Sequence, residues 1–450
     1  MLTNAVRDIL AGAVVLGVLI LLHEWGHFIA AKLCGVRVDV FSIGFGPRLW
    51  GVKRGDTDYR ISGLPLGGYV RMAGDNPVEG RTGAAYEFLS KPRWQRAIIV
   101  IAGPAINILV TFVIFWGIFV FAGMPVEPYM HQPADVVAVP SSNPANAGVQ
   151  PGDRILEVNR VPTPTWGKAT KAVANAKPGD SLSIVVLRNG VRQPLTVQVP
   201  SDDSVVVSIA DSVLGYPALP PLVEETMQGL PAQKTGMKAG DVVTSINGKP
   251  VVTWPQMVDR VQSSNGATIH FVVRRDGKDV ALDITPIHMM NSDGEMQWMI
   301  GATPPKTEGI YEHQGIIESV KDAGVETAFY ARLMGGIFVG LFSGKVSMHD
   351  LAGPVGIVQM SGQAAKGGPL TLLQWMAYIS LDLGLLNLLP IPIFDGGHLL
   401  MFGIEGTIRR DLSITFKERF VQVGLVFLLG LFAFVMYNDI LRVGSGVWWK

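Results

Sequence analysis

Four stretches of this 450-residue chain are apolar for long enough to cross a lipid bilayer, which takes about 20 residues each. They are residues 9–31, 97–126, 367–389 and 420–437. Ionisable side chains interrupt only the first stretch, with His23, Glu24 and His27, and the third, with Asp382. The composition agrees, because 48% of the residues are hydrophobic and only 16% are charged. The sequence therefore predicts a polytopic α-helical membrane protein with about four transmembrane helices.

Charge and cysteine content exclude several other classes of protein. The chain has 37 basic and 37 acidic residues and a formal net charge of zero, which gives no electrostatic reason to expect a nucleic-acid partner. Its single cysteine, Cys34, excludes an internal disulfide and a cysteine-rich metal cluster. The N-terminal residues MLTNAVRDIL lack the pattern of a cleaved signal peptide, so we expect the first apolar stretch to be retained as a membrane helix.

Positive charge is concentrated on two of the connections between the apolar stretches. Residues 32–96 contain eleven Lys or Arg, and the connection before the fourth stretch adds Arg409, Arg410, Lys417 and Arg419. Because cytoplasmic loops are enriched in these residues, we expect both chain ends and the long insert between stretches two and three to face outward. The histidines then lie toward the cytoplasmic end of the first helix.

The insert contains an internal repeat with an offset of 88 residues. The sequence AGVQPGDRILEVNRVPTPTW at 147–166 corresponds to TGMKAGDVVTSINGKPVVTW at 235–254, and each copy combines a Gly-Asp turn, a short strand and a hairpin. The pattern resembles PDZ domains, more closely in the second copy, because the first has Arg160 in place of Gly248. We therefore expect two PDZ-like β-barrel domains, at 127–203 and 204–302. Such domains bind extended peptides by strand addition; the alternative role is a spacer or steric cover.

The remaining segments divide the membrane domain into two parts, 1–126 and 367–450. Within the first part, residues 39–73 are rich in aromatic, β-branched and glycine residues, and they predict short strands and hairpins associated with the membrane on its cytoplasmic side. Residues 303–366 are expected to form a linker and an amphipathic helix, near 318–345, on the outer membrane surface. The alternative is an additional core helix, and Arg332 argues against a fifth crossing.

The first apolar stretch contains the motif H-E-x-x-H, within LILLHEWGHFIAA at 19–31. On a helix, His23 and His27 lie four residues apart on one face, where both imidazoles can reach one zinc ion. Glu24 in this motif acts as the general base. The alternative is a pair of buried histidines that hydrogen-bond to the backbone or to each other. Inside a membrane segment, however, ionisable residues are usually functional, which favours a metal site.

A catalytic zinc needs a third protein ligand, and the candidates are Asp382, Asp395 and His398. The stretch NLLPIPIFDGGH at 387–398 favours Asp395, because two prolines break the helix and two glycines let the backbone approach closely. Alternatively, Asp395 only caps a helix that begins at Gly396.

The pair formed by H-E-x-x-H and N-x-x-P-x-P-x-x-D-G resembles the site-two protease family of intramembrane metalloproteases. The resemblance also covers FSIGFGP, PLGGYVRM, AGPAIN, the PDZ pair and LAGPVGI (351–357), and so extends over nearly the whole chain. It implies one zinc per chain held by His23, His27 and Asp395, with Glu24 as the catalytic acid and base. It also implies a bacterial inner-membrane protein that cuts a peptide bond within a substrate's transmembrane helix after another protease has trimmed the substrate. Anti-sigma factors and signal-peptide remnants are the implied substrates.

A peptide bond inside a membrane helix is shielded, so the substrate must unwind and be held extended. The β-rich segment with Gly67 and Gly68 is expected to offer a strand edge for it. Asn387, Pro390 and Pro392 at the helix break are further candidates for substrate binding. Asn107 is expected to brace the packing of the second helix.

Asp382 lies outside the family motifs, and two roles are open for it. It either stays protonated and bonds to a neighbouring helix, or it lines a water-filled path to the site.

Two other functions fit parts of the pattern. A catalytically silent scaffold that binds peptides through its PDZ pair requires loss of Glu24 or of a zinc ligand, and all of these residues are present. A transporter with a broken helix predicts inverted repeats among the membrane segments, and the repeat lies in the insert instead.

Overall fold

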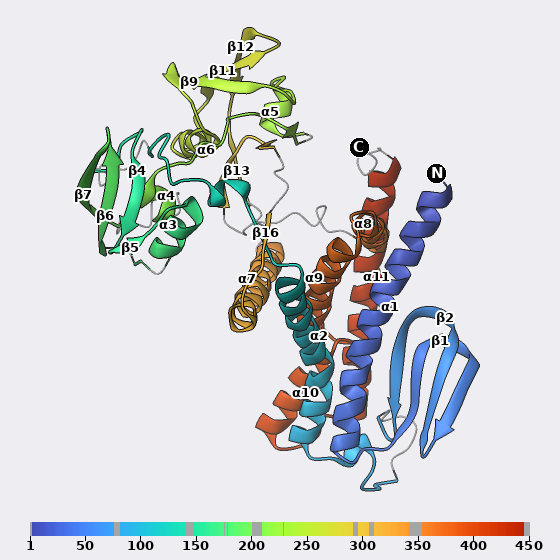
Figure 1. The fold of residues 1–450 in the computed structure, drawn as a ribbon. Coiled ribbons are helices and arrows are strands. Elements are labelled where there is room, and N and C mark those ends of the chain that lie inside the picture. The colour runs from blue at the N-terminus through green and yellow to red at the C-terminus, as the bar shows by residue number, and fades with distance from the viewer. Residues whose placement is uncertain are drawn as a thin grey trace. The chain divides into compact units, whose positions relative to one another are not determined.

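The structure, a computed structural model, describes residues 2–75, 82–140, 148–174, 176–177, 179–199, 209–227, 229–290, 296–305, 310–342 and 353–444. All five predicted domains, and three of the shorter segments discussed above, extend beyond these ranges. The three shorter segments are the first repeat copy at residue 147, the LAGPVGI motif at 351–352 and the expected amphipathic helix at 343–345. The chain forms two compact units, Met1–Met124 with His313–Lys450, and Pro125–Glu312 (Figure 1).

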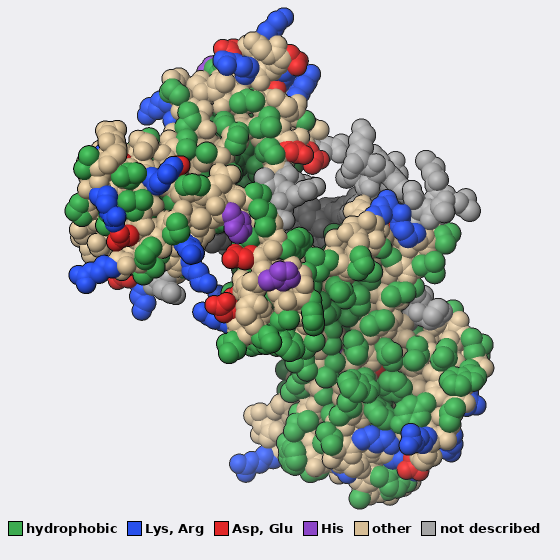
Figure 2. Space-filling view, in the orientation of Figure 1, with side chains coloured by type: hydrophobic (Ala, Val, Ile, Leu, Met, Phe, Trp, Pro, Cys, Tyr) green, Lys and Arg blue, Asp and Glu red, His purple; other side chains and the backbone are tan. Residues whose placement is uncertain are grey.

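The first unit is mainly helical, and in the part that the structure describes four helices are long and apolar enough to cross a membrane. These four, α1, α2, α9 and α11, coincide with the four apolar stretches and confirm that prediction. Only 11% of the most apolar part of α11 is buried within the protein, an exposure that suits a lipid environment. Hydrophobic side chains cover much of the visible face of these helices (Figure 2). The helices are α1 (Leu2–Leu33), α2 (Arg93–Phe121), α7 (Ile316–Phe342), α8 (Pro354–Lys366), α9 (Pro369–Leu388), α10 (Asp395–Ile408) and α11 (Ile414–Gly444).

Helix α2 packs against α1, α7, α9 and α10, and small residues bring these helices close together. A Cβ atom on Gly26 of α1 would overlap the carbonyl oxygen of Ala102, and one on Gly384 of α9 would lie 3.1 Å from that of Pro104. Helix α7, expected near 318–345, packs on α2 and α9. The Tyr330 hydroxyl of α7 lies 2.9 Å from that of Tyr378 on α9. Contacts with two helices of the bundle favour the alternative prediction for this segment, an additional core helix, over a helix on the membrane surface.

The β-rich segment forms two long strands, β1 (Val38–Arg54) and β2 (Thr57–Met72), where the sequence predicted short ones. The strands bend, so that Val40 of β1 lies opposite both Asp58 and Arg71 of β2. The bend is possible because Gly44 has a φ of +86°, and a Cβ at this position would overlap the Leu64 carbonyl. The result is an antiparallel sheet with outer edges at residues 68–72 and 48–54. Strand β2 packs against α1 (Figure 1).

The second unit contains two four-stranded antiparallel sheets with the strand orders β5-β4-β6-β7 and β10-β9-β11-β12. Neither sheet closes into a barrel in the described part of the chain, so the expected β-barrels are open sheets. The elements of the first sheet are β4 (Arg154–Val158), β5 (Val161–Pro162), α3 (Trp166–Val173), β6 (Ser181–Arg188), β7 (Val191–Gln198) and α4 (Ile209–Leu214). Those of the second are α5 (Pro231–Lys234), β9 (Val242–Ile246), β10 (Lys249–Pro250), α6 (Trp254–Gln262), β11 (Ile269–Arg275) and β12 (Lys278–Ile284).

Shorter elements complete the two units. Three small pairs of strands lie outside the four-stranded sheets: β15 with β8, β13 with β14, and β16 with β3. The strands of these pairs are β3 (Met124–Val126), β8 (Glu225–Thr226), β13 (Ile287–Met290), β14 (Met296–Met299), β15 (Ala302–Thr303) and β16 (Ile310–Glu312). The described residues also form two short 3-10 helices, η1 (Phe88–Ser90) and η2 (Pro128–His131).

The two repeat copies share an ion pair between a buried aspartate and a partly buried arginine, as well as a strand order. The Arg188 guanidinium donates to Asp153 at 2.7 Å, and Arg275 donates to Asp241 at 2.7 Å. Burial of Asp241 is the largest single effect and disfavours its charge, but the hydrogen bonds from Arg275 and from the Lys238 N–H, together with the charges of both residues, hold the pKa of Asp241 below its ordinary value. The two aspartates are 88 residues apart, so the internal repeat predicted from the sequence is present in the fold.

The hairpin turn of the first copy carries a strained residue that the second copy avoids. Arg160 has a φ of +65° where Gly248 has +74°, and a side chain in this region costs about 1–2 kcal/mol. Because glycine also gains entropy in the unfolded chain, we expect Arg160→Gly to raise the free energy of unfolding of this copy by a net of about 0.5–1 kcal/mol. Arg160→Ala keeps the Cβ and serves as the control. A thermal unfolding series in which both variants behave alike would contradict the strain argument.

Candidate metal centre

The two histidines of the first apolar stretch lie one turn apart on α1, as the motif predicts. Their side chains are buried, with relative exposures of 7% for His23 and 9% for His27. The Nε2 atoms of the two rings lie 3.1 Å apart, and the rings meet edge to face. Both Nε2 atoms therefore face one point beside the helix.

Asp395 reaches this point from a sharp break between α9 and α10. Helix α9 ends at Leu388, and Ile393 in the following loop has a φ of +89°, which is unfavourable for a β-branched residue. Helix α10 then begins at Asp395 itself. Cβ atoms on Gly396 and Gly397 would overlap the Leu389 and Ile391 carbonyl oxygens. The two glycines thus allow a turn tight enough to present the carboxylate at the start of the helix.

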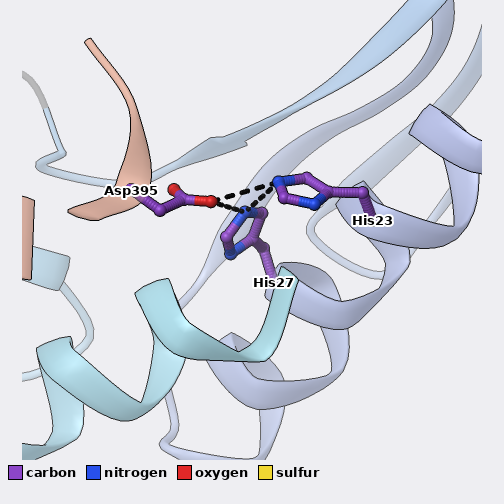
Figure 3. Close-up of side chains that lie close together, drawn as sticks. All are labelled: His23, His27 and Asp395. Carbon is purple, nitrogen blue, oxygen red and sulfur yellow. Dashed lines mark hydrogen bonds and ion pairs between the residues drawn. The ribbon is translucent and has the colours of Figure 1, made fainter. Parts of the chain in front are cut away.

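The three side chains form one compact cluster (Figure 3). Oδ2 of Asp395 lies 3.1 Å from His23 Nε2 and 3.4 Å from His27 Nε2. The cluster therefore consists of two imidazole nitrogens from α1 and one carboxylate oxygen from α10.

This cluster fits a zinc ion. Ligand atoms about 2.0–2.1 Å from a tetrahedral zinc lie about 3.3 Å from one another, which is the spacing of these three atoms. Two imidazoles and one carboxylate are also a recognised donor set for catalytic zinc. Gly103 on α2 leaves the necessary space, because a Cβ there would overlap His27 Nε2 and lie 2.8 Å from His23 Nε2.

Glu24 lies beside the cluster and contacts the β sheet. Its Oε2 accepts a hydrogen bond of 3.1 Å from the backbone N–H of Val70 in β2. A Cβ on Gly68 would lie 3.7 Å from Glu24 Cγ. The edge of the sheet at 68–72 is therefore next to the predicted general base.

Both imidazoles contact α2 through their second nitrogen. Nδ1 of His27 lies 2.8 Å from the carbonyl oxygen of Ile99, to which it donates a hydrogen bond. Nδ1 of His23 lies 3.3 Å from the side-chain amide of Asn107. Asn107, which the sequence analysis assigned to helix packing, thus packs within the bundle and also contacts a histidine of the cluster.

The other predicted site residues occupy different positions. Gly67 packs against Phe45 and Ile20, beside Gly68. Asn387 is half-buried in the last turn of α9, and Pro390 and Pro392 lie in the loop that follows. In the described part of the chain, no hydrogen bond joins Asn387 to the cluster.

Neither of the alternative third ligands belongs to the cluster. Asp382 is half-buried on α9, and among the described residues it has no hydrogen-bonding or ionic partner. His398 is half-buried one turn after Asp395 on α10. The structure therefore brings Asp395 alone to the two histidines.

Three features of the site were not expected from the sequence: the Ile99 carbonyl, the Val70 N–H and the space above Gly103. The first two are backbone groups, which every residue has, so no residue type marks them. Gly103 belongs to the AGPAIN motif, and the spacing of that motif from the prolines and histidines gives no sign that it lies against the histidine nitrogens.

Comparison with known proteins gives consistent matches over nearly the whole chain. The profile of peptidase family M50 matches residues 11–431. A putative zinc metalloprotease of Vibrio cholerae is 32% identical over 98% of this chain and 100% of its own length. The regulator of sigma-E protease RseP of Escherichia coli is 30% identical over 97% of this chain and 99% of its own. A putative zinc metalloprotease of Neisseria meningitidis is 31% identical over 95% of this chain and 97% of its own length.

Proposed function

Because the chain belongs to peptidase family M50 and is a zinc metalloprotease, we propose that it cuts peptide bonds within the transmembrane segments of membrane proteins. The observation that carries this proposal is the location of the His23–His27–Asp395 cluster. Two of its three side chains project from α1, a helix long and apolar enough to cross a membrane. Hydrolytic groups on such a helix are placed where a substrate's membrane segment lies.

In this proposal His23, His27 and Asp395 hold one zinc ion per chain. When bound, zinc polarises the scissile carbonyl and lowers the pKa of a water molecule, so that hydrolysis proceeds at neutral pH. Glu24 accepts a proton from the attacking water and returns it to the amine that leaves. The Val70 N–H holds Oε2 of Glu24, which leaves the other carboxylate oxygen to carry the proton.

The sheet edge beside Glu24 supports a mode of substrate binding. A peptide bond in a helix is hydrogen-bonded, so the substrate must be extended before it is cut. Residues 68–72 pair with β1 on one side only, and their other edge lies by α1. We assign the part of this edge around Gly67 and Gly68 to the extended substrate, which joins as an added strand, because the N–H groups of Val70 and Met72 already donate to Glu24 and Asp75. The absence of side chains at Gly67 and Gly68 leaves room for it, and Asn387, Pro390 and Pro392 contact it from the helix break.

We further propose that the insert consists of two PDZ-like domains, predicted from the sequence at 127–203 and 204–302, with the boundary moved past α4 because Val213 and Leu214 pack in the core of the first copy. The shared strand order and the shared Asp–Arg pair support this division. Residues 303–366 connect them to the second part of the membrane domain, at 367–450, which completes the first part at 1–126. Peptide capture and exclusion of bulky substrates are the two roles that such domains serve beside a protease.

The substrate class follows from the relatives. Since a relative is named a regulator of sigma-E protease, we propose anti-sigma factors already trimmed by another protease, or signal-peptide remnants, as substrates. We place the protein in a bacterial inner membrane with both ends and the insert outside. In support, the basic residues Arg93, Arg96 and Lys417 gather around the buried Glu405, where α2 and α11 begin and α10 ends. Such a basic end is expected on the cytoplasmic side.

The proposed function is tested by Glu24→Gln in the purified full-length protein. We expect the variant to keep about one zinc per chain, because Glu24 is not a ligand, and to cleave a membrane-spanning substrate about 10²–10⁴-fold more slowly. Glu418→Gln, which removes an exposed carboxylate from the start of α11, is the control and should cleave normally. Normal cleavage by Glu24→Gln would refute the catalytic role of Glu24. Cuts mapped outside the substrate's membrane segment would refute the intramembrane activity.

A further inference from the structure

The two zinc-facing histidines each have a second ring nitrogen that points to α2. His27 Nδ1 has the Ile99 carbonyl as an acceptor at 2.8 Å. His23 Nδ1 has only the Asn107 side chain, at 3.3 Å, in the described part of the chain. The partner of His27 is a pure acceptor, whereas an amide side chain offers either an acceptor or a donor.

Zinc binding by His23 determines whether the Asn107 amide must offer its acceptor oxygen or its donor nitrogen to His23 Nδ1. A neutral imidazole that ligates through Nε2 has its lone pair on that atom, so its proton is on Nδ1. The Nδ1–H group of His23 is then a buried donor that needs an acceptor. Among the described residues, the one oxygen that can fill this position is Oδ1 of Asn107.

The surroundings of Asn107 point to the same orientation. Its side chain is completely buried, and Oδ1 accepts no hydrogen bond when the amide nitrogen faces His23. A half rotation of an amide side chain exchanges its oxygen and nitrogen with almost no change in shape. Which atom is the oxygen is therefore assigned from the hydrogen bonds that each can make. Turning the amide by half a rotation pairs Oδ1 with the Nδ1–H group and removes the unpaired buried acceptor.

The backbone of Asn107 is held firmly in place. Its carbonyl oxygen accepts hydrogen bonds from Ser380 Oγ at 2.9 Å and from Thr111 Oγ1 at 3.0 Å. A Cβ on Gly384 would lie 3.3 Å from Asn107 Cβ, so α9 also confines the side chain. Asn107 therefore has little freedom to turn away from His23.

We propose that Asn107 is a positioning residue for zinc: its Oδ1 accepts the Nδ1–H proton of His23 and keeps Nε2 free to bind the metal. Helix α2 then orients both imidazoles, through the Ile99 carbonyl for His27 and through Asn107 for His23. The inference rests on the proposed ligand set, because it requires that His23 binds zinc through Nε2. Partners of this kind typically change metal affinity by 10–100-fold.

The test is the zinc affinity of the purified full-length protein in detergent, measured as the chelator concentration that removes half of the zinc. Asn107→Leu, which has no acceptor, is expected to bind zinc about 10–100-fold more weakly. Asn107→Asp keeps an oxygen and cannot donate a hydrogen bond, and it is expected to bind zinc at least as tightly as the unmodified protein. Phe115→Leu alters buried packing two turns away on α2, in contact with neither Asn107 nor the cluster, and should leave zinc binding unchanged.

The outcomes separate positioning from packing and from the ligand set. Wild-type affinity in Asn107→Leu would overturn the proposal, and so would equal losses in Asn107→Asp and Asn107→Leu. A loss in Phe115→Leu that matches the loss in Asn107→Leu would also overturn it, because packing would then explain both. His23→Ala tests the ligand set separately: full zinc retention in that variant would refute the proposed site whatever Asn107 does. Circular dichroism shows whether each variant is folded, and the comparison of Asp with Leu remains decisive when Leu lowers stability.

Discussion

A Gly103→Ala variant is expected to lose both zinc and proteolytic activity, although it adds only one methyl group. The new Cβ would overlap His27 Nε2 and lie 2.8 Å from His23 Nε2, the two nitrogens of the proposed metal site. Moving helices α1 and α2 apart to make room would sacrifice their close packing, in which Gly26 lies against the Ala102 carbonyl. Since both histidines would be displaced, we expect zinc affinity to fall by roughly 100-fold or more.

Gly117→Ala is the matched control on the same helix. Among the described residues, no atom outside the local helix backbone lies within 4 Å of a Cβ built on Gly117, so the methyl group meets open space there. Alanine is also a better helix former than glycine, so this variant should be as stable as the unmodified protein or slightly more so. If the Gly103→Ala variant retains as much zinc and cleaves as fast as the Gly117→Ala control, then α2 does not cover the metal-binding atoms.

The membrane helices and the repeat were predictable because their signals are local in the sequence. Length and lack of charge identified α1, α2, α9 and α11 without any knowledge of their packing. The match between 147–166 and 235–254 identified two similar units. The length of β1 and β2 was not predictable in this way, since the two strands bend and pair twice, and the bend depends on the backbone of Gly44.

The candidate site was predictable to the extent that side-chain type and spacing define it. A separation of four residues places His23 and His27 on one helix face, and the break after α9 distinguished Asp395 from Asp382. The roles of Gly103 and Asn107 depend on how α2 packs against α1, and no local pattern encodes that packing. Sequence reasoning therefore found the side chains that meet at the cluster and missed the helix that orients them.

The second large effect is expected from Asp395→Ala. The loop and the two glycines after it place this carboxylate 3.1 Å and 3.4 Å from the two imidazole nitrogens. Without it, two histidines remain, and two ligands do not hold a catalytic zinc tightly. We therefore expect at least about a 100-fold loss of zinc affinity. Asp382→Asn removes the other carboxylate predicted as a possible ligand and should leave zinc binding unchanged, because Asp382 lies outside the cluster.

The most direct measurement is thus the zinc content of the unmodified protein, Asp395→Ala and Asp382→Asn after dialysis against the same chelator. The three-residue centre predicts about one zinc per chain in the unmodified protein and in Asp382→Asn, and almost none in Asp395→Ala. Full zinc content in Asp395→Ala, or its loss in Asp382→Asn alone, would contradict a metal centre shared by α1 and α10.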